Sequence, residues 1–208
     1  MLTATGRNTV NITVIAPSVI ADQPQLDLPY AFEEVNKIRS AAGENRINTL
    51  LGEQATVHQV SCHLSTGTWQ HLACHGYQDP LDPLKSCLML HDGELELAQI
   101  LNTALSSAEF VFLSGCETRM GDAQLVNESM HLAGGMILAG FCGAIGTMWS
   151  IADFDMPKVA NIVYHELFKE GKDPKVTEAA QALHVAVQTM CRHGVPLHRW
   201  LPLVHIGV

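Results

Sequence analysis

The chain has 208 residues, which is enough for one α/β domain with a sizeable hydrophobic core. Hydrophobic residues make up 47% of the sequence and charged residues only 16%, a composition that excludes an intrinsically disordered chain. The net charge is −9 with histidine neutral, and lysine and arginine form no cluster. We therefore expect neither a nucleic acid nor a membrane as a partner.

Six cysteines occur, and no two of them form a C-x-x-C pair. Most lie in apolar runs, where an unpaired cysteine behaves as a small buried hydrophobe. Residues 1–10 show no signal peptide, so we expect reduced thiols rather than a disulfide framework. The sequence therefore predicts a cytoplasmic protein.

Apolar runs and turn residues divide the chain into alternating strands and helices. Short β-branched or apolar runs predict strands over residues 11–16, 55–60, 69–74, 87–90, 109–113, 144–151 and 201–206. Apolar residues at helical spacing, together with start and stop signals, predict helices over residues 30–42, 46–51, 97–105, 130–140, 154–170 and 174–190. This alternation predicts an α/β fold with a mostly parallel sheet covered by helices on both faces.

One stretch, residues 132–151, carries no charge and is long enough to span a bilayer. Its glycines divide it into an apolar first half and a second half typical of a buried strand. A buried helix, a turn and a strand explain this glycine pattern better than a membrane span does.

Two of the predicted strands end in residues that could carry chemistry. One ends at His75-Gly76, and the other ends at Ser114-Gly115-Cys116. Ligands bind beyond the carboxyl ends of strands in open α/β sheets, so an imidazole and a thiol would meet there if the two strands are neighbours. The imidazole could activate the thiol as a nucleophile, and the backbone N–H groups of Gly76 and Cys116 could bind a developing oxyanion. From the residues alone, packing in the core stays the commoner role for a single cysteine.

Two segments resemble the signature motifs of CHAT domains, which are caspase-like domains related to separases and often joined to tetratricopeptide arrays. These segments are residues 71–76 (HLACHG) and 113–118 (LSGCET). Further segments resemble the family in the same order along the chain, namely residues 28–37 (LPYAFEEVNK), 93–100, 121–122, 133–140, 147–155 (TMWSIADFD) and 200–207. The resemblance covers about residues 10–208.

The resemblance implies a caspase-like three-layer α/β/α sandwich, in one domain over residues 1–208 that is shorter at its N-terminus than larger members. It implies a cysteine endopeptidase, a hydrolase of peptide bonds, with His75 as general base and acid and Cys116 as nucleophile. The implied partners are a polypeptide substrate and an upstream helical-repeat sensor or regulatory protein. The caspase motif Q-A-C-x-G is absent, and residues 114–118 (SGCET) stand in its place.

Asp153 and Asp155 follow the predicted strand over residues 144–151. In the separase-like branch of the family this region lines the pocket for the residue that precedes the cut. Two carboxylates there could hold the arginine or lysine side chain of a substrate. The alternative is that Asp153 caps the helix that begins at Phe154, because aspartate is a preferred helix cap. We expect that helix, over residues 154–170, and the loop over residues 77–85 to flank the cleft.

Other functions compete with proteolysis. A zinc site could use His71, Cys74 and His75, but alternate residues of a strand face opposite sides and cannot all reach one ion. No G-x-G-x-x-G follows the first strand and no G-x-S-x-G occurs, which disfavours a dinucleotide-binding oxidoreductase and a serine hydrolase. We therefore expect neither a metal nor a cofactor. A catalytically silent CHAT-like regulatory or interaction module stays open.

Overall fold

The computed structural model describes residues 10–17, 28–79, 81–115, 130–149 and 151–208. Within these residues eight strands form one sheet, in which six strands follow the order β2-β1-β3-β6-β7-β8 and the β4–β5 hairpin extends from β3. Strands β2, β1, β3, β6 and β7 run parallel, and β8 runs antiparallel to β7. The strands are β1 (Ile12–Ala16), β2 (Ile47–Leu51), β3 (Trp69–Tyr77), β4 (Cys87–Leu90), β5 (Gly93–Glu96), β6 (Phe110–Gly115), β7 (Gly143–Thr147) and β8 (Leu203–Gly207).

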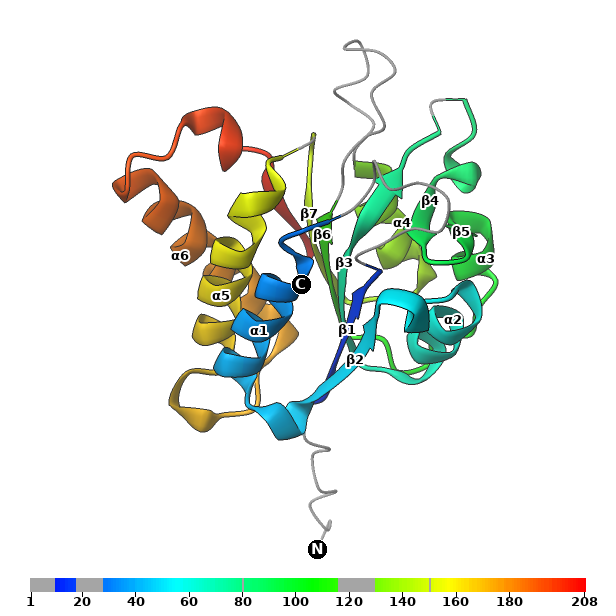
Figure 1. Ribbon diagram of the computed structural model, residues 1–208, viewed down its shortest axis with the longest axis horizontal. Helices are drawn as coiled ribbons and strands as arrows, with labels where there is room; N and C mark the ends of the chain where they lie inside the picture. Colours follow the sequence, from blue (N-terminus) through cyan, green and yellow to red (C-terminus); the bar gives the residue numbers. More distant parts are fainter. Residues whose placement is uncertain (1–9, 18–27, 80, 116–129, 150) are drawn as a thin grey trace, which may run out of the picture.

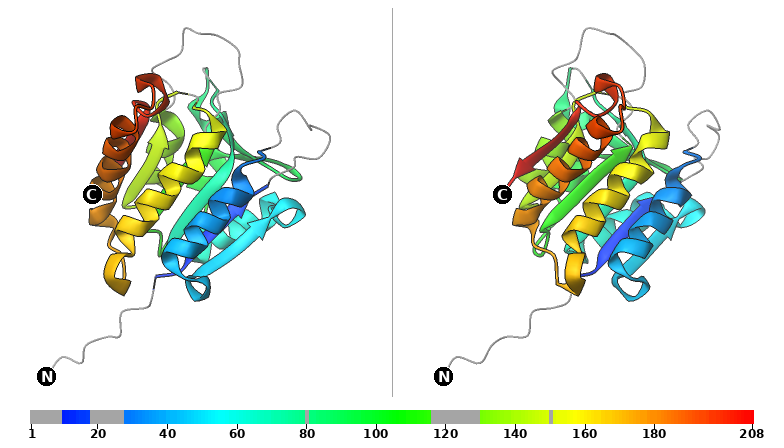
Figure 2. Two further views of the ribbon diagram at one scale, coloured as in Figure 1. Left: turned by 60° about the vertical axis from the view of Figure 1, so that its left-hand side comes forward. Right: turned by 90° about the vertical axis from the view of Figure 1, so that its left-hand side faces the viewer.

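Helices cover both faces of this sheet (Figure 1 and Figure 2). One face carries α1 (Ala31–Ala42), α5 (Met156–Leu167) and α6 (Ala179–Arg192), and the other carries α2 (Val57–Thr66), α3 (Leu97–Leu101) and α4 (Met130–Ala139). A separate apolar cluster fills the space on each side of the sheet. The structure confirms the predicted three-layer α/β/α sandwich with a mostly parallel sheet.

Short 3₁₀ helices join several of these elements. Two of them matter for the site, because they lie at the end of the sheet where β7 ends and the antiparallel β8 begins. These are η5 (Asp153–Asp155) and η8 (Leu197–Arg199). The others are η2 (Glu44–Arg46), η3 (Gly52–Gln54), η4 (Pro83–Lys85), η6 (Lys169–Gly171) and η7 (Val176–Glu178).

The burial of each element follows from its sequence. Every residue of β1 (ITVIA) is buried, because the strand lies inside the sheet and helices cover both of its faces. Helix α1 buries Ala31, Val35 and Ile38 at spacings of three and four residues, which form its inward side. Glu34 belongs to the same buried row and is only 2% exposed. A carboxyl group on the inward side of a core helix requires a polar partner inside the protein.

Two short elements differ from the sequence prediction. The predicted helix over residues 46–51 is wrong, because this segment forms β2 and pairs with β1. The predicted strand over residues 55–60 is also wrong, because α2 begins there and Thr56 caps it by accepting a hydrogen bond from the backbone N–H of Gln59 at 3.2 Å. The predicted helix over 97–105 ends at Leu101, the strand over 144–151 ends at Thr147, and the helix over 174–190 begins at Ala179.

The uncharged stretch over residues 132–151 is divided as its glycines predict. Helix α4 covers its first part, a turn follows at Gly140, and β7 covers most of its second part. Across the described ranges, no helix has both the length and the apolar character that crossing a membrane requires.

Candidate active site

The predicted catalytic histidine lies where two neighbouring parallel strands reach the same edge of the sheet. His75 belongs to β3 and pairs in register with Gly115, the last residue of β6. The two strands are neighbours in the sheet, so the condition on which the predicted site depends is met (Figure 1). The His75 side chain is buried and only 4% exposed.

A β-bulge in β3 sets this register. Leu72 pairs with Leu113 and His75 pairs with Gly115, so two residues of β3 lie opposite one residue of β6 between these pairs. Bulges occur next to active sites because they change the direction of the chain and of the side chains that follow. Here the bulge lies directly before His75, and it therefore determines where the imidazole meets the end of β6.

Gly115 allows the two strands to come close beside the bulge. A Cβ atom at this position would lie 2.3 Å from the carbonyl oxygen of Cys74, nearer than real Cβ atoms approach a backbone atom. A larger residue would therefore push the end of β6 away from β3. The glycine of the S-G-C segment is explained by this contact, and the pairing of His75 with Gly115 depends on it.

Cys116, the predicted nucleophile, lies outside the described residues. Its side chain and its backbone N–H, which we assigned to the oxyanion hole, are not placed by the structure. Gly76, the other predicted oxyanion donor, lies in β3 and pairs with Leu88 of β4. The β4–β5 hairpin thus pairs with β3 directly after His75 and holds the backbone there.

The two predicted substrate-binding aspartates lie together in η5, directly before α5, but the structure gives them different partners. Asp155 is fully buried, and its two oxygens accept hydrogen bonds from Nε and Nη2 of Arg199 at 2.6 and 2.5 Å. The same guanidinium lies over the ring of Phe154, 4.5 Å from its centroid. Asp153 is half-buried, and its Oδ2 accepts a hydrogen bond from the backbone N–H of Tyr30 at 3.3 Å.

The helix-cap alternative assigned Asp153 to the start of a helix at Phe154. Helix α5 begins at Met156 instead, and its N-cap residue is Asp155, whose side chain makes no capping hydrogen bond. Ala152 occupies the N-cap position of η5. The bidentate pair with Arg199 explains the burial of the Asp155 carboxylate, because a buried charge needs a charged or hydrogen-bonding partner.

A family model described as "CHAT domain" matches residues 5–207. The chain belongs to the CHAT domain family. Two solved structures are similar over 96% of this chain, each at 13% identity and a TM-score of 0.60. One is the complex of the pro- and mature domains of RgpB from Porphyromonas gingivalis, and the other is the Arg-specific cysteine proteinase gingipain R (RgpB).

This CHAT domain spans about half the length of those two chains, 47% and 46% respectively. At 13% identity the likeness shows the fold alone, which is the caspase-like fold of the gingipains. No curated protein matches the chain. The family and the fold that the motifs predicted are therefore both confirmed.

The structure of this CHAT domain contains a buried polar cluster that the sequence prediction does not include. Oε1 of Glu34 lies 3.0 Å from Nε2 of His71, and Nδ1 of His71 lies 3.1 Å from the hydroxyl of Tyr164. The same Oε1 accepts a hydrogen bond from Oγ of Ser114 at 2.5 Å. Each of the four side chains is at most 2% exposed.

The signal for this cluster was present in the sequence. Glu34 occupies an inward position of α1, and His71 occupies an inward position of β3. Both residues also lie in the segments that resemble the family motifs. Buried polar residues need partners, so two such positions on facing elements indicate a contact between them.

The geometry also bears on the zinc alternative. His71 contacts Glu34 and Tyr164 on the face covered by α1 and α5, whereas Cys74 belongs to the apolar cluster on the opposite face. The predicted separation of these two side chains is confirmed, and they cannot hold the same ion. Within the described residues, no three His, Cys, Asp or Glu side chains are grouped as metal ligands.

Proposed function

We propose that this CHAT domain is a cysteine endopeptidase whose catalytic dyad is His75 and Cys116. The observation that carries the proposal is the pairing of His75 with Gly115 across β3 and β6. Gly115 is bonded to Cys116, so chain connectivity brings the thiol-bearing residue within one peptide unit of the strand position beside His75. The family and the likeness to cysteine proteinases support the same chemistry.

The reaction requires one base and one nucleophile. The His75 imidazole takes the proton of the Cys116 thiol, and the thiolate attacks the carbonyl carbon of the scissile peptide bond. Backbone N–H groups of Gly76 and Cys116 stabilise the resulting oxyanion. The C–N bond then breaks, and the proton on His75 passes to the leaving amine. Water, deprotonated by His75, hydrolyses the thioester and restores the thiol.

We further propose that cleavage follows a basic residue and that Asp153 contributes most to this preference. Asp155 is engaged by Arg199, so Asp153 is the more accessible of the two predicted carboxylates. The pair of Asp155 and Arg199 supports the idea that this part of the chain holds a guanidinium, by a bidentate carboxylate and an aromatic face. Gingipain R, which shares the fold, is described as Arg-specific.

The substrate, the regulator and the cellular compartment of the enzyme are also proposed. We infer a polypeptide substrate and, as a regulator, an upstream helical-repeat sensor or regulatory protein. A reducing compartment such as the cytoplasm fits the described cysteines, which form no disulfide: Cys62, Cys74, Cys87, Cys142 and Cys191.

The test is hydrolysis of fluorogenic peptides that differ only in the residue before the cut, which is Arg, Lys or Asp. We expect cleavage of the Arg and Lys peptides, loss of activity in Cys116→Ala and His75→Ala, and full activity in Cys191→Ala, which removes an exposed free thiol. Asp153→Asn should raise KM for the Arg peptide. Faster cleavage of the Asp peptide would reject the basic preference. Equal activity in the Cys116 and Cys191 variants would reject the dyad, and a wild-type protein that cleaves none of the three peptides would favour a regulatory module.

A further inference from the structure

One carboxylate oxygen joins the two strands that lead to the proposed dyad. Oε1 of Glu34, on α1, contacts Nε2 of His71 on β3 and accepts the hydrogen bond of Oγ of Ser114 on β6. The two strands are neighbours in the sheet, so the contact crosses from one strand to the next. Glu34 is the part of α1 that makes this bridge, because its side chain lies in the inward row of the helix.

The contacts of Glu34 with β3 and β6 lie just before the residues of the proposed dyad along both strands. His71 precedes His75 by four residues on β3, and Ser114 precedes Cys116 by two residues at the end of β6. The bulge between Leu72 and His75 interrupts the regular pairing of β3 with β6 there. A bulge leaves a residue unpaired and weakens the ladder locally. The Glu34 carboxylate therefore connects the strands where the backbone ladder is weakest.

The hydrogen atoms of the cluster have one consistent arrangement. Burial, and secondly the nearby Glu34, hold the pKa of Tyr164 well above its usual range, so the phenol keeps its proton. The acceptor that the structure gives this phenol is Nδ1 of His71. The ring then carries its proton on Nε2, 3.0 Å from Oε1 of Glu34, and the same oxygen accepts the hydrogen bond of Ser114. The cluster thus holds two hydrogen bonds, from Tyr164 to His71 and from Ser114 to Glu34, and a close contact between His71 and Glu34.

We propose that Glu34 and Ser114 are positioning residues of the peptidase, which hold the end of β6 against β3 so that Cys116 meets His75. This inference rests on the proposed function. Neither residue touches the substrate in this scheme, and both act through the strands. A displacement of reacting groups by about 1 Å can cost about a hundredfold in rate, so a contact that fixes strand alignment has a large effect on chemistry.

The test measures how fast iodoacetamide alkylates Cys116 as pH is varied, by mass spectrometry of its peptide. The exposed Cys62 and Cys191 serve as internal references. In the wild type, we expect the midpoint of the Cys116 profile to lie below that of a free thiol, about 8.5. Ser114→Ala should move the midpoint towards about 8.5 and lower peptide hydrolysis about tenfold in kcat, with little change in KM. Glu34→Gln keeps an acceptor oxygen, so its alkylation midpoint and kcat should lie between those of the wild type and those of Ser114→Ala.

The matched control is Val111→Ala, on the same strand but in the apolar cluster on the opposite face of the sheet. It should destabilise the fold through a cavity and leave the Cys116 profile unchanged. An unchanged profile and unchanged kcat in Ser114→Ala, with His75→Ala still inactive, would overturn the positioning role and spare the proposed function. A wild-type profile already at the free-thiol value, with no peptide hydrolysis, would overturn both.

Discussion

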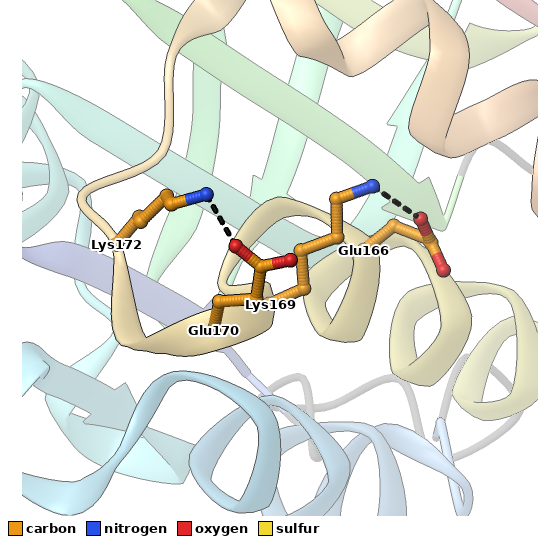
Figure 3. A network of polar contacts seen from close by, with 4 residues as sticks. All are labelled: Glu166, Lys169, Glu170 and Lys172. Carbon is orange, nitrogen blue, oxygen red and sulfur yellow. Dashed lines mark hydrogen bonds and ion pairs between the residues drawn. The ribbon is translucent and has the colours of Figure 1, made fainter.

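Helix α5 takes part in two polar clusters that differ in their surroundings. Towards the sheet, Tyr164 contacts His71 in the cluster that includes Glu34 and Ser114. At its C-terminal end, Nζ of Lys169 donates to Glu166 at 3.2 Å, and Lys172 pairs with Glu170 (Figure 3). The first cluster lies inside the protein, and the second lies on its surface.

The difference in exposure decides what each cluster contributes. The side chains of Glu34 and His71 are 2% and 0% exposed, whereas those of Glu170 and Lys172 are 65% and 72% exposed. Exposed ion pairs contribute little, because water and salt screen them and the free side chains are well solvated. A buried polar group without its partner is costly, because nothing replaces the lost contact. Polar contacts in the buried cluster and on the surface should therefore respond very differently to mutation.

The largest expected effect is that of Glu34→Ala. The substitution leaves the buried Ser114 hydroxyl without its acceptor, removes the carboxylate beside His71 and opens a cavity, and we expect the free energy of unfolding to fall by about 2–4 kcal/mol. Urea denaturation of the full chain measures this change. Glu33→Ala is the matched control, because Glu33 is the exposed neighbour on the same helix. Equal losses in the two variants would contradict the role of the buried cluster.

A smaller but functionally severe effect is expected for Gly115→Ala. The added Cβ would meet the Cys74 carbonyl oxygen, and such overpacking costs about 1–3 kcal/mol. Peptide hydrolysis should fall more than stability does, because the change separates the ends of β3 and β6. Gly134→Ala in α4 is the control. A Cβ there meets nothing within 4 Å, and alanine favours a helix by about 1 kcal/mol. Normal hydrolysis by Gly115→Ala would show that this close approach is dispensable.

Tyr164→Phe should cost about 1 kcal/mol, because it removes one hydrogen bond from the cluster. It should also change the alkaline branch of the stability curve. The folded protein holds the pKa of this phenol above its ordinary value of about 10, so the unfolded chain loses the proton first and stability falls as pH rises beyond about 10. Denaturation at several pH values above 9 measures this slope, which should be shallower in the variant. The same slope in both proteins would show that Tyr164 does not set it.

The smallest effect is expected for Lys172→Ala on the exposed side of the comparison. The hydrogen bond and charge of Lys172 hold the pKa of Glu170 below its usual range, and that pKa should rise in the variant. The thermal midpoint should stay the same within error at both low and high salt, because the pair is exposed on both sides. A clear fall of the thermal midpoint would mean that the exposed pair of Lys172 and Glu170 contributes more to stability than its exposure predicts.

The sequence predicted the central part of the fold and the place of the site. Apolar runs identified β1, β3, β6 and β7, because these strands are buried on both faces and their composition is distinctive. The secondary structure predicted for residues 46–51 and 55–60 was wrong for a physical reason. Edge strand β2 depends on its pairing with β1, and α2 depends on the Thr56 cap, whereas the valines of α2 locally favour a strand.

The site itself could be predicted only in part. His75 and the segment over residues 114–116 were found because each directly follows a strand that its apolar run predicts, over residues 69–74 and 109–113. The bulge could not be predicted, because it is a property of two paired strands and has no local pattern. The pair of Asp155 with Arg199 joins residues 44 positions apart in the chain, and no spacing rule connects them. Contacts across elements therefore decided the geometry that the motifs could only indicate.

The most direct test of the account is the site of covalent labelling by an arginyl acyloxymethyl ketone, mapped by mass spectrometry on the folded protein. A catalytic thiolate displaces the carboxylate of this probe and becomes alkylated, whereas ordinary thiols react slowly. We expect the adduct on Cys116, far above the exposed Cys62 and Cys191, and its loss in His75→Ala. Labelling of all three cysteines at similar rates, unaffected by His75→Ala, would contradict the proposed dyad.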